Sequence, residues 1–231
     1  MFQIVSHFTL VPRPTASAAV VSVNTYFEKG FTGSPASPQS FVSNAGTVAG
    51  TVAANANRVM ICMVQFRAAS SVTATPSWNG VAMTAINSIN SDATSDYVGL
   101  WGLKNPASGN QSLSLTFTGT ITNFSLGAIC FDNADQVTGW VDRGWTTGTS
   151  TGVTSTISTG AGNAVLHFIA NNNSAGAITT SPGTQIYTDT AFQGNAIAAY
   201  KLSTSSSETI TTGWVTSAIQ YVIGTVDILH A

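Results

Sequence analysis

Short segments in which apolar residues alternate with polar ones recur along most of the chain after residue 40, and this period predicts β-strands rather than helices. The clearest predicted strands are 58–66, 81–87, 97–103, 112–118 and 124–131. Turn sequences separate them, such as Asn79-Gly80, a dipeptide that favours positive φ at the tip of a hairpin. Because helical periodicity is nearly absent, the sequence predicts an all-β protein.

The second part of the chain repeats this order of segments. GNAVLHFIAN (162–171) parallels ANRVMICMVQ (56–65), SPGTQIYTDT (181–190) parallels SWNGVAMTAI (77–86), 196–214 parallels 99–117, and IQYVIGTVDIL (219–229) parallels FSLGAICFDNA (124–134). We therefore expect two related four-stranded halves, about 55–131 and 160–229, packed into one antiparallel, jelly-roll-like β-sandwich, because a lone half would leave an apolar face in water. The alternative is two separate domains joined near 146–156, a Ser/Thr/Gly-rich stretch typical of a linker or a long crossover.

Residues 1–44 do not follow this pattern, so we expect an extended N-terminal arm before a sandwich at 45–231. The apolar residues of the arm alternate imperfectly with polar ones: Phe2, Ile4, Phe8 and Leu10. Pro12 and Pro14 follow and favour extended backbone. Such a segment can add a strand to a sheet edge, which makes the four apolar residues the predicted interface with a neighbouring subunit or a capsid. An edge strand of the chain's own sandwich is the alternative.

Charged residues make up 7% of the chain, and the formal net charge is −2. An ordinary globular domain carries about 25% charged residues. The seven basic residues stand far apart and form no stripe of the kind that binds phosphates. No run of about 18 apolar residues predicts a membrane-spanning helix. We therefore expect neither nucleic acid nor a membrane as a partner.

No arrangement of residues predicts catalysis, a metal ion or another cofactor, and we expect the chain not to be an enzyme. The three histidines, His7, His167 and His230, lack the spacing of a zinc site. The aspartates of 92–96 and 132–142 predict turn capping, with calcium as the alternative. Cys62 and Cys130 lie in apolar runs and are expected as buried free thiols, with a disulfide between them as the alternative.

The segment GWVDRGW places Trp140 and Trp145 around Arg143 in a predicted loop. Three alternatives remain open for these residues: core aromatics that flank a turn, a protein interface, in which Trp and Arg are favoured, or a platform for a carbohydrate.

The segments NRVMICMVQF, SWNGVAMTAI, LWGLKNPASGNQSLSLTF and LGAICFDNADQ resemble a β-sandwich domain that recurs in bacteriophage virion proteins and in uncharacterised bacterial proteins. The resemblance covers roughly residues 45–170. It rests on Asn57 and Arg58 before the first strand, on the Trp-Asn-Gly turn at 78–80, and on the segment from Trp101 through Asn105 and Pro106 to Gly109. It carries no catalytic residues over to this chain, and its motif residues are expected to determine the fold.

Such domains occur in capsid decoration proteins and fibres. The resemblance therefore implies a non-enzymatic structural virion protein, and we expect a capsid decoration or cement protein that packs on the major capsid protein of a phage head. A homo-oligomer is expected as well, because sheet edges with few charges invite cover by another strand or subunit. The alternative is a fibre tip or receptor-binding module that recognises a host surface glycan.

Overall fold

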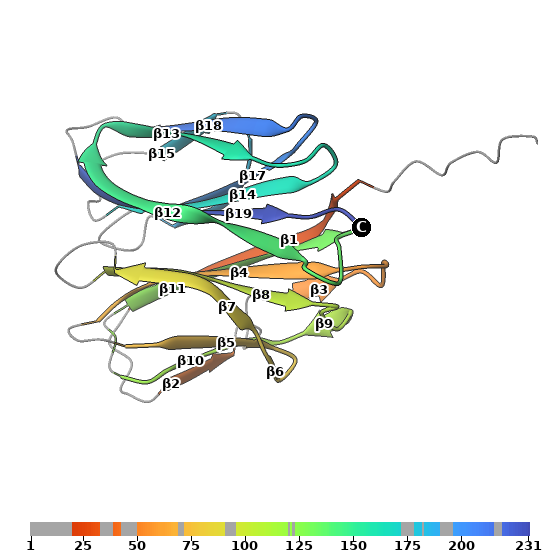
Figure 1. Ribbon diagram of the computed structural model, residues 1–231. Helices are drawn as coiled ribbons and strands as arrows, with labels where there is room; N and C mark the ends of the chain where they lie inside the picture. Colours follow the sequence, from red (N-terminus) through yellow and green to blue (C-terminus); the bar gives the residue numbers. More distant parts are fainter. Residues whose placement is uncertain are drawn as a thin grey trace, which may run out of the picture.

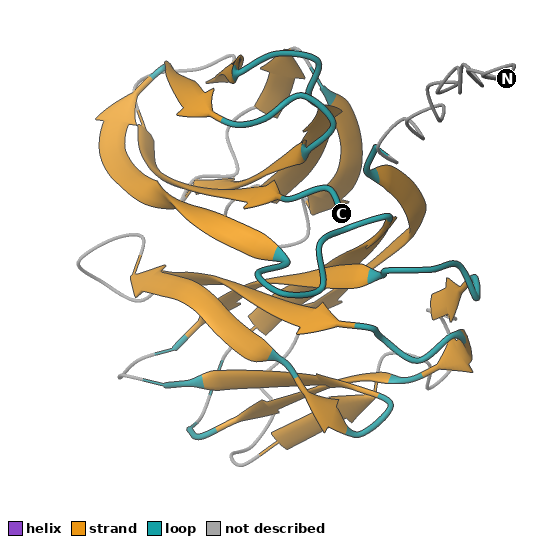
Figure 2. Cartoon of the chain, turned by 45° about the vertical axis from the view of Figure 1, so that its right-hand side comes forward, coloured by secondary structure: helices purple, strands orange, loops and turns teal. Residues whose placement is uncertain are grey.

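The computed structural model describes residues 20–32, 39–42, 50–68, 72–90, 96–119, 121, 123–171, 178–181, 183–189, 196–214 and 219–231. Within these residues the regular elements are β-strands, and none is a helix (Figure 2). The strands pair antiparallel in several stacked sheets. The prediction of an all-β antiparallel sandwich is confirmed.

The first half of the chain forms two sheets. The first inner sheet has the order β1 (Ser22–Thr32), β11 (Asn123–Asp132), β4 (Val59–Arg67), β8 (Asp96–Lys104), β7 (Thr84–Asn90). The first outer sheet has the order β2 (Gln39–Val42), β10 (Leu113–Phe117), β5 (Ala74–Trp78), β6 (Val81–Ala82). A short pair, β3 (Gly50–Val52) and β9 (Gly109–Gln111), lies beside them.

The second half also forms two sheets. The second inner sheet has the order β12 (Trp140–Ser150), β19 (Ile219–Ile228), β14 (Ala164–Asn171), β17 (Ala196–Leu202), β16 (Thr184–Asp189). The second outer sheet has the order β13 (Gly152–Ser158), β18 (Ser207–Trp214), β15 (Ile178–Ser181). Figure 1 shows the four sheets stacked in layers, with the two inner sheets in the middle.

A shared hydrophobic cluster joins the two inner sheets, and both halves contribute to it. Val59, Ile61 and Met63 of β4 belong to it together with Leu166 and Phe168 of β14. The alternate residues of β4 pack into a second cluster, between the first inner and outer sheets. Every residue of β4 except the last is buried, because other sheets cover both faces of this strand. A continuous apolar run such as Val59–Val64 is typical of a strand in that position.

The two halves have the same strand order. In each inner sheet, the strand that comes first in the chain lies at one edge and pairs with the strand that comes last in the chain. The order β1-β11-β4-β8-β7 thus corresponds to β12-β19-β14-β17-β16. Val59 pairs with Lys104 where Ala164 pairs with Leu202. The structure therefore matches Val59 with Ala164. The alignment of 162–171 with 56–65 in the sequence instead matches Val59 with Val165, so it is wrong by one residue. A shift of one residue exchanges the two faces of a strand, so this correction decides which side chains of β14 face the shared cluster.

Each half has more than the four strands that the sequence predicts, and some of the additional strands lie in segments that were expected to form an arm or a linker. Residues 22–32 and 39–42, expected within the N-terminal arm, are β1 and β2, so the described sandwich begins at residue 22 instead of 45. Residues 146–156, expected as a linker or crossover, lie in β12 and β13, and Figure 1 shows β12 curving from one sheet into the other. Residues 146–156 are rich in threonine, which favours strands even where apolar residues are few.

Candidate interaction sites

The Trp140–Trp145 segment lies in strand β12 and not in the loop that the sequence predicts. A register shift between Asp142 and Gly144 leaves Arg143 unpaired in the ladder with β19. Such a bulge redirects the side chain of the extra residue. Trp140 and Trp145 pack against the shared cluster of the inner sheets, whereas Arg143 reaches Asp227.

Both tryptophans lie over glycines. A Cβ added to Gly102 of β8 would come within 2.6 Å of the Trp140 ring, and one added to Gly224 of β19 would come within 2.7 Å of the Trp145 ring. The Lys104 ammonium lies 5.9 Å from the centre of a Trp140 ring, which is within the range of a cation–π contact. These contacts place both tryptophans at the junction of the halves, and a role in binding a partner or a glycan stays a prediction.

A buried carboxylate holds Arg143 in place. Asp227 has no exposed surface, and its Oδ2 accepts a hydrogen bond of 2.6 Å from Nη2 of Arg143. Its Oδ1 accepts hydrogen bonds from the Thr159 hydroxyl at 2.7 Å and from the Asn163 amide at 3.2 Å. Asn163 in turn accepts a hydrogen bond of 3.0 Å from the His230 backbone N–H. The network thus satisfies a buried charge and attaches the C-terminal end of the chain to the second half.

A groove of about 340 Å³ opens between β12 and β13, at one side of the second half. Residues 143–146 and 154–157 line it, together with Ile223 and Thr225. The Thr225 hydroxyl also lies 3.2 Å from Nδ1 of His167, a fully buried histidine. Hydroxyl groups and one guanidinium make this groove suitable for hydrogen bonding to a polar ligand.

The first half has a hollow of a different character. Phe66, Met83, Tyr97 and Trp101 are among the residues that line a space of about 280 Å³. The Phe66 and Tyr97 rings stack with centres 5.0 Å apart and planes 6° apart. This lining is mainly apolar, so a ligand or partner in this space would gain burial of apolar surface and few hydrogen bonds.

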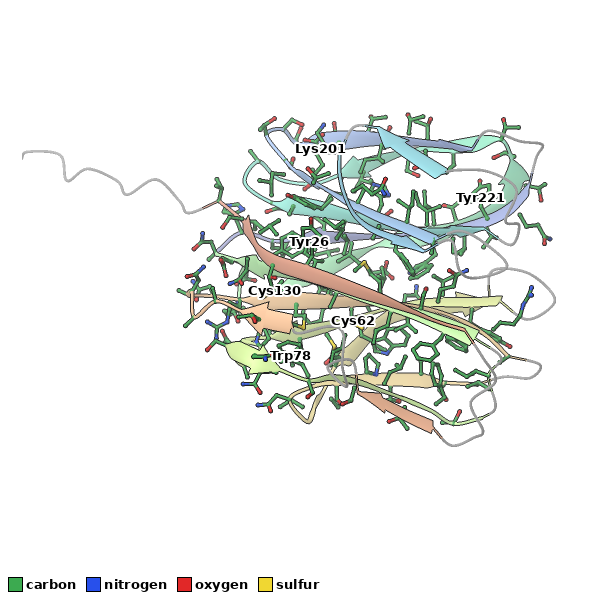
Figure 3. All side chains as sticks on the ribbon, turned by 180° about the vertical axis from the view of Figure 1, so that it is seen from behind. Tyr26, Cys62, Trp78, Cys130, Lys201 and Tyr221 are labelled. Carbon is green, nitrogen blue, oxygen red and sulfur yellow. The ribbon has the colours of Figure 1, made fainter. Side chains whose placement is uncertain are left out.

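The residues on which the family resemblance rests stabilise turns in the first half. Asn57, Asn79 and Asn105 adopt positive φ values of 54°, 49° and 48°, which asparagine tolerates better than most residues. Arg58 donates a hydrogen bond of 3.1 Å from Nε to the Pro106 carbonyl. Trp78, a fully buried side chain that Figure 3 labels, donates one of 2.8 Å from Nε1 to the Ala107 carbonyl. These contacts fix the 105–109 turn against the start of β4 and the end of β5.

The cysteines have no reactive character. Cys62 and Cys130, both labelled in Figure 3, are buried and free, as the sequence predicts. Burial raises the pKa of the Cys62 thiol far above its usual range and that of the Cys130 thiol to about 12. Reactive cysteines instead have a lowered pKa.

The aspartates of 132–142 cap turns and hold side-chain amides. Asp135 accepts hydrogen bonds from the backbone N–H groups of Val137 at 3.1 Å and Thr138 at 2.8 Å. The bonds from Thr138 and then Val137 lower its pKa. Asp132 accepts amide hydrogen bonds from Asn24 and Asn55. In the described part of the chain, no group of three or more His, Cys, Asp or Glu side chains is arranged to hold a metal ion.

The predicted arm residues Phe2, Ile4, Phe8 and Leu10 lie outside the described residues, as do His7 and Asp92. The interface role of the arm therefore stays a prediction. Within the described residues, no helix is long and apolar enough to span a membrane.

Three features of these sites escaped the sequence analysis: the Arg143–Asp227 pair, the groove and the edge strand β13. Arg143 and Asp227 are distant in sequence, and only the pairing of β12 with β19 brings them together. A signal was present in the sequence, because Asp227 interrupts an otherwise uncharged apolar run, VIGTVDIL. A charge in such a run predicts a buried partner.

No family model matches the sequence, and no curated protein matches it either. A comparison with solved structures found a chain described as "Structure of infectious bursal disease virus Gx strain", with 12% sequence identity and a TM-score of 0.20. The match covers 98% of this chain and 47% of that chain, so the present chain spans about half the length of the viral one. A TM-score of 0.20 is too low to carry an argument about fold or function.

Proposed function

We propose that this chain is a non-enzymatic structural virion protein, and specifically a capsid decoration or cement protein of a phage head. The observation that carries the proposal is the resemblance of residues 45–170 to sandwich domains of virion proteins. Its motif residues hold turns in place, as Arg58 does for the 105–109 turn. Motif residues that hold turns in place serve the scaffold of the fold, which supports a structural role.

The packing of the layers supports the same proposal. The shared cluster draws on both inner sheets, and separate clusters lie between inner and outer sheets. Interactions of one half with the other therefore stabilise the whole described sandwich. A protein that covers a capsid needs such a stable body and accessible strand edges for neighbouring subunits.

Mass spectrometry of purified virions tests the proposal. For a decoration protein we expect a copy number close to that of the major capsid protein or a simple fraction of it. A copy number typical of a tail appendage would favour the fibre-tip alternative. Absence of the protein from intact virions would contradict both.

Attachment through the arm can be tested with a chain that lacks residues 1–19. We expect this variant to fold, because the contacts of the described chain begin at Val20 and Val21, whose backbone groups bond to Asn133 and Gly162. The truncated chain should no longer bind virions that lack the protein, while the full chain should bind them. Equal binding by both would show that the arm is not the attachment site.

One observation favours the alternative function. The groove between β12 and β13 presents hydroxyl groups and the Arg143 guanidinium, which are groups that bind saccharides in water through hydrogen bonds. A glycan array with the full chain and with a Thr146→Val variant separates the two functions. Selective glycan binding that is lost in the variant would favour a receptor-binding module, and no binding would favour the decoration protein.

A further inference from the structure

Strand β13 is an edge strand that lacks the features that usually prevent pairing with another chain. It pairs with β18 over its whole length, from Gly152 to Ser158, without a register shift. Among the described residues, no strand pairs with its other side. A regular edge of this kind presents unpaired backbone N–H and C=O groups to another chain.

The other long edge strands are interrupted. In β1, β12, β7 and β16, the ladder with the neighbouring strand contains a register shift. Bulges of this type bend an edge and prevent further pairing. The remaining edge strands of the described inner and outer sheets, β2, β6 and β15, have four residues or fewer. Among the described edge strands of the inner and outer sheets, β13 is therefore the one that is both long, with seven residues, and regularly paired. It also carries no charged residue.

The sequence of β13 reads almost the same in both directions. The order Gly-Val-Thr-Ser-Thr-Ile-Ser is centred on Ser155, with a threonine on each side of it and a β-branched apolar residue beyond each threonine. Val153 packs against Tyr221 and Ile157 against Val165 and Ile210, so both face the interior of the second half. The threonines are exposed on the outer face.

We propose that β13 pairs antiparallel with β13 of a second copy of this chain, around a twofold axis at Ser155. This register places Val153 opposite Ile157 of the second copy and Thr154 opposite Thr156 of the second copy. Apolar side chains thus meet apolar ones on the inner face, and hydroxyls meet hydroxyls on the outer face. A twofold contact requires a self-complementary surface of this kind, and the near-palindromic sequence provides it.

The outer face of the existing sheet already shows the threonine pairing that the proposed contact would continue. The hydroxyls of Thr154 and Thr211 lie 3.1 Å apart, as do those of Thr156 and Thr209. Pairing two copies would join two three-stranded outer sheets into one continuous sheet. The added strand would also lie beside the groove between β12 and β13, whose β13 wall consists of residues 154–157.

The proposal gives the homo-oligomer that the sequence predicts a defined contact, and it can fail independently of the proposed function. A strand of seven residues buries little surface compared with the roughly 1,000 Å² of a stable interface. We therefore expect reversible association, which sedimentation velocity measures on the full chain over a hundredfold range of concentration. The sedimentation coefficient should rise toward that of two chains.

Two double variants test the contact. Thr154→Lys with Thr156→Lys places two pairs of like charges opposite each other across the axis, and association should weaken by about tenfold or more. Thr154→Lys with Thr156→Glu places opposite charges in the same positions and should restore association. Thr209→Lys with Thr211→Lys is the matched control, because it puts the same charges on the same face but on β18, the middle strand of the second outer sheet.

A wild-type chain that sediments as a single chain over the whole range would overturn the proposal. So would a Lys/Lys variant that associates as strongly as the wild type, or a control that weakens association equally. Equal melting temperatures of the variants would show that the charges act on association and not on folding. The copy number in virions is a separate measurement and decides the proposed function alone.

Discussion

The two halves of the chain have the same strand order but different interiors. Between the first inner and outer sheets, the central strand β4 contributes Cys62, and β11 contributes Ala128 and Cys130. The strand register places His167, Thr225 and Asp227 at the matching positions of the second half, and all three are buried. The shared cluster between the inner sheets is apolar on both sides. The two halves therefore share an apolar cluster between the inner sheets, whereas the interiors between inner and outer sheets differ in chemistry.

The outer sheet of the second half likewise has a more polar interior than that of the first half. The interior residues of the middle outer strand are Leu113, Leu115 and Phe117 in β10 but Glu208, Ile210 and Thr212 in β18. Glu208 forms an ion pair with Lys201. The first half is therefore stabilised mainly by apolar burial, whereas the second half buries several polar groups, of which the carboxylates of Asp227 and Glu208 are paired.

The largest difference between the halves should appear when a large interior side chain is removed. Phe117 is fully buried, and its ring contacts the Phe66 and Phe124 rings at centre distances of 5.2 and 5.5 Å. Phe117→Ala should lower the free energy of unfolding by about 3 to 5 kcal/mol, because it leaves a cavity. Thr212→Val in the matching strand of the second half should change it by less than about 1 kcal/mol, since the buried Thr212 hydroxyl has no hydrogen-bond partner among the described residues. Urea denaturation measures both, and equal losses would remove the contrast.

The next effect comes from the ion pair of the second half. Arg143→Met leaves the Asp227 carboxylate buried without its charged partner. Since Arg143 is partly exposed, we expect a loss near the lower limit for a broken buried pair, about 3 kcal/mol. Combining Arg143→Met with Asp227→Asn should recover part of that loss, because the buried charge is gone. A double variant that loses as much as Arg143→Met alone, or more, would contradict this account.

A smaller effect should distinguish the halves by pH. Burial lowers the pKa of His167 from 6.5 to about 4. As the pH falls below 6.5, the unfolded chain binds this proton before the folded chain does, so stability decreases until the pH reaches about 4. Between pH 7 and pH 5 the loss should be about 2 kcal/mol. His167→Val should remove this loss, and an unchanged pH dependence in the variant would show that another group is responsible.

The sequence predicts the parts of the fold in which local signals agree. The uninterrupted apolar run of β4 and the Asn79-Gly80 turn appear as expected. Strand β13 escaped prediction because its threonines and serines leave it little apolar character, and β1 because its apolar residues, Val23, Tyr26, Phe27 and Phe31, do not alternate regularly with polar ones. Their position at sheet edges explains this pattern, since an edge strand needs fewer buried side chains.

The candidate sites depend on contacts that sequence alone does not contain. The sequence places Trp140 and Trp145 in a loop, whereas pairing of β12 with β19 directs their rings toward Gly102 and Gly224. A glycine in a strand indicates close approach of another group, but it does not identify that group. Similarly, the sequence shows three histidines but not that His167 is buried, and this burial is what lowers its pKa and makes stability depend on pH.

Differential scanning calorimetry of the full chain tests most directly whether the shared cluster makes the two halves one cooperative unit. Val59 and Ile61 of the first half pack in the same cluster as Leu166 and Phe168 of the second. We predict a single transition in which the calorimetric and van't Hoff enthalpies agree, as for a two-state domain. Two separable transitions, one sensitive to Phe117→Ala and the other to Arg143→Met, would contradict the account.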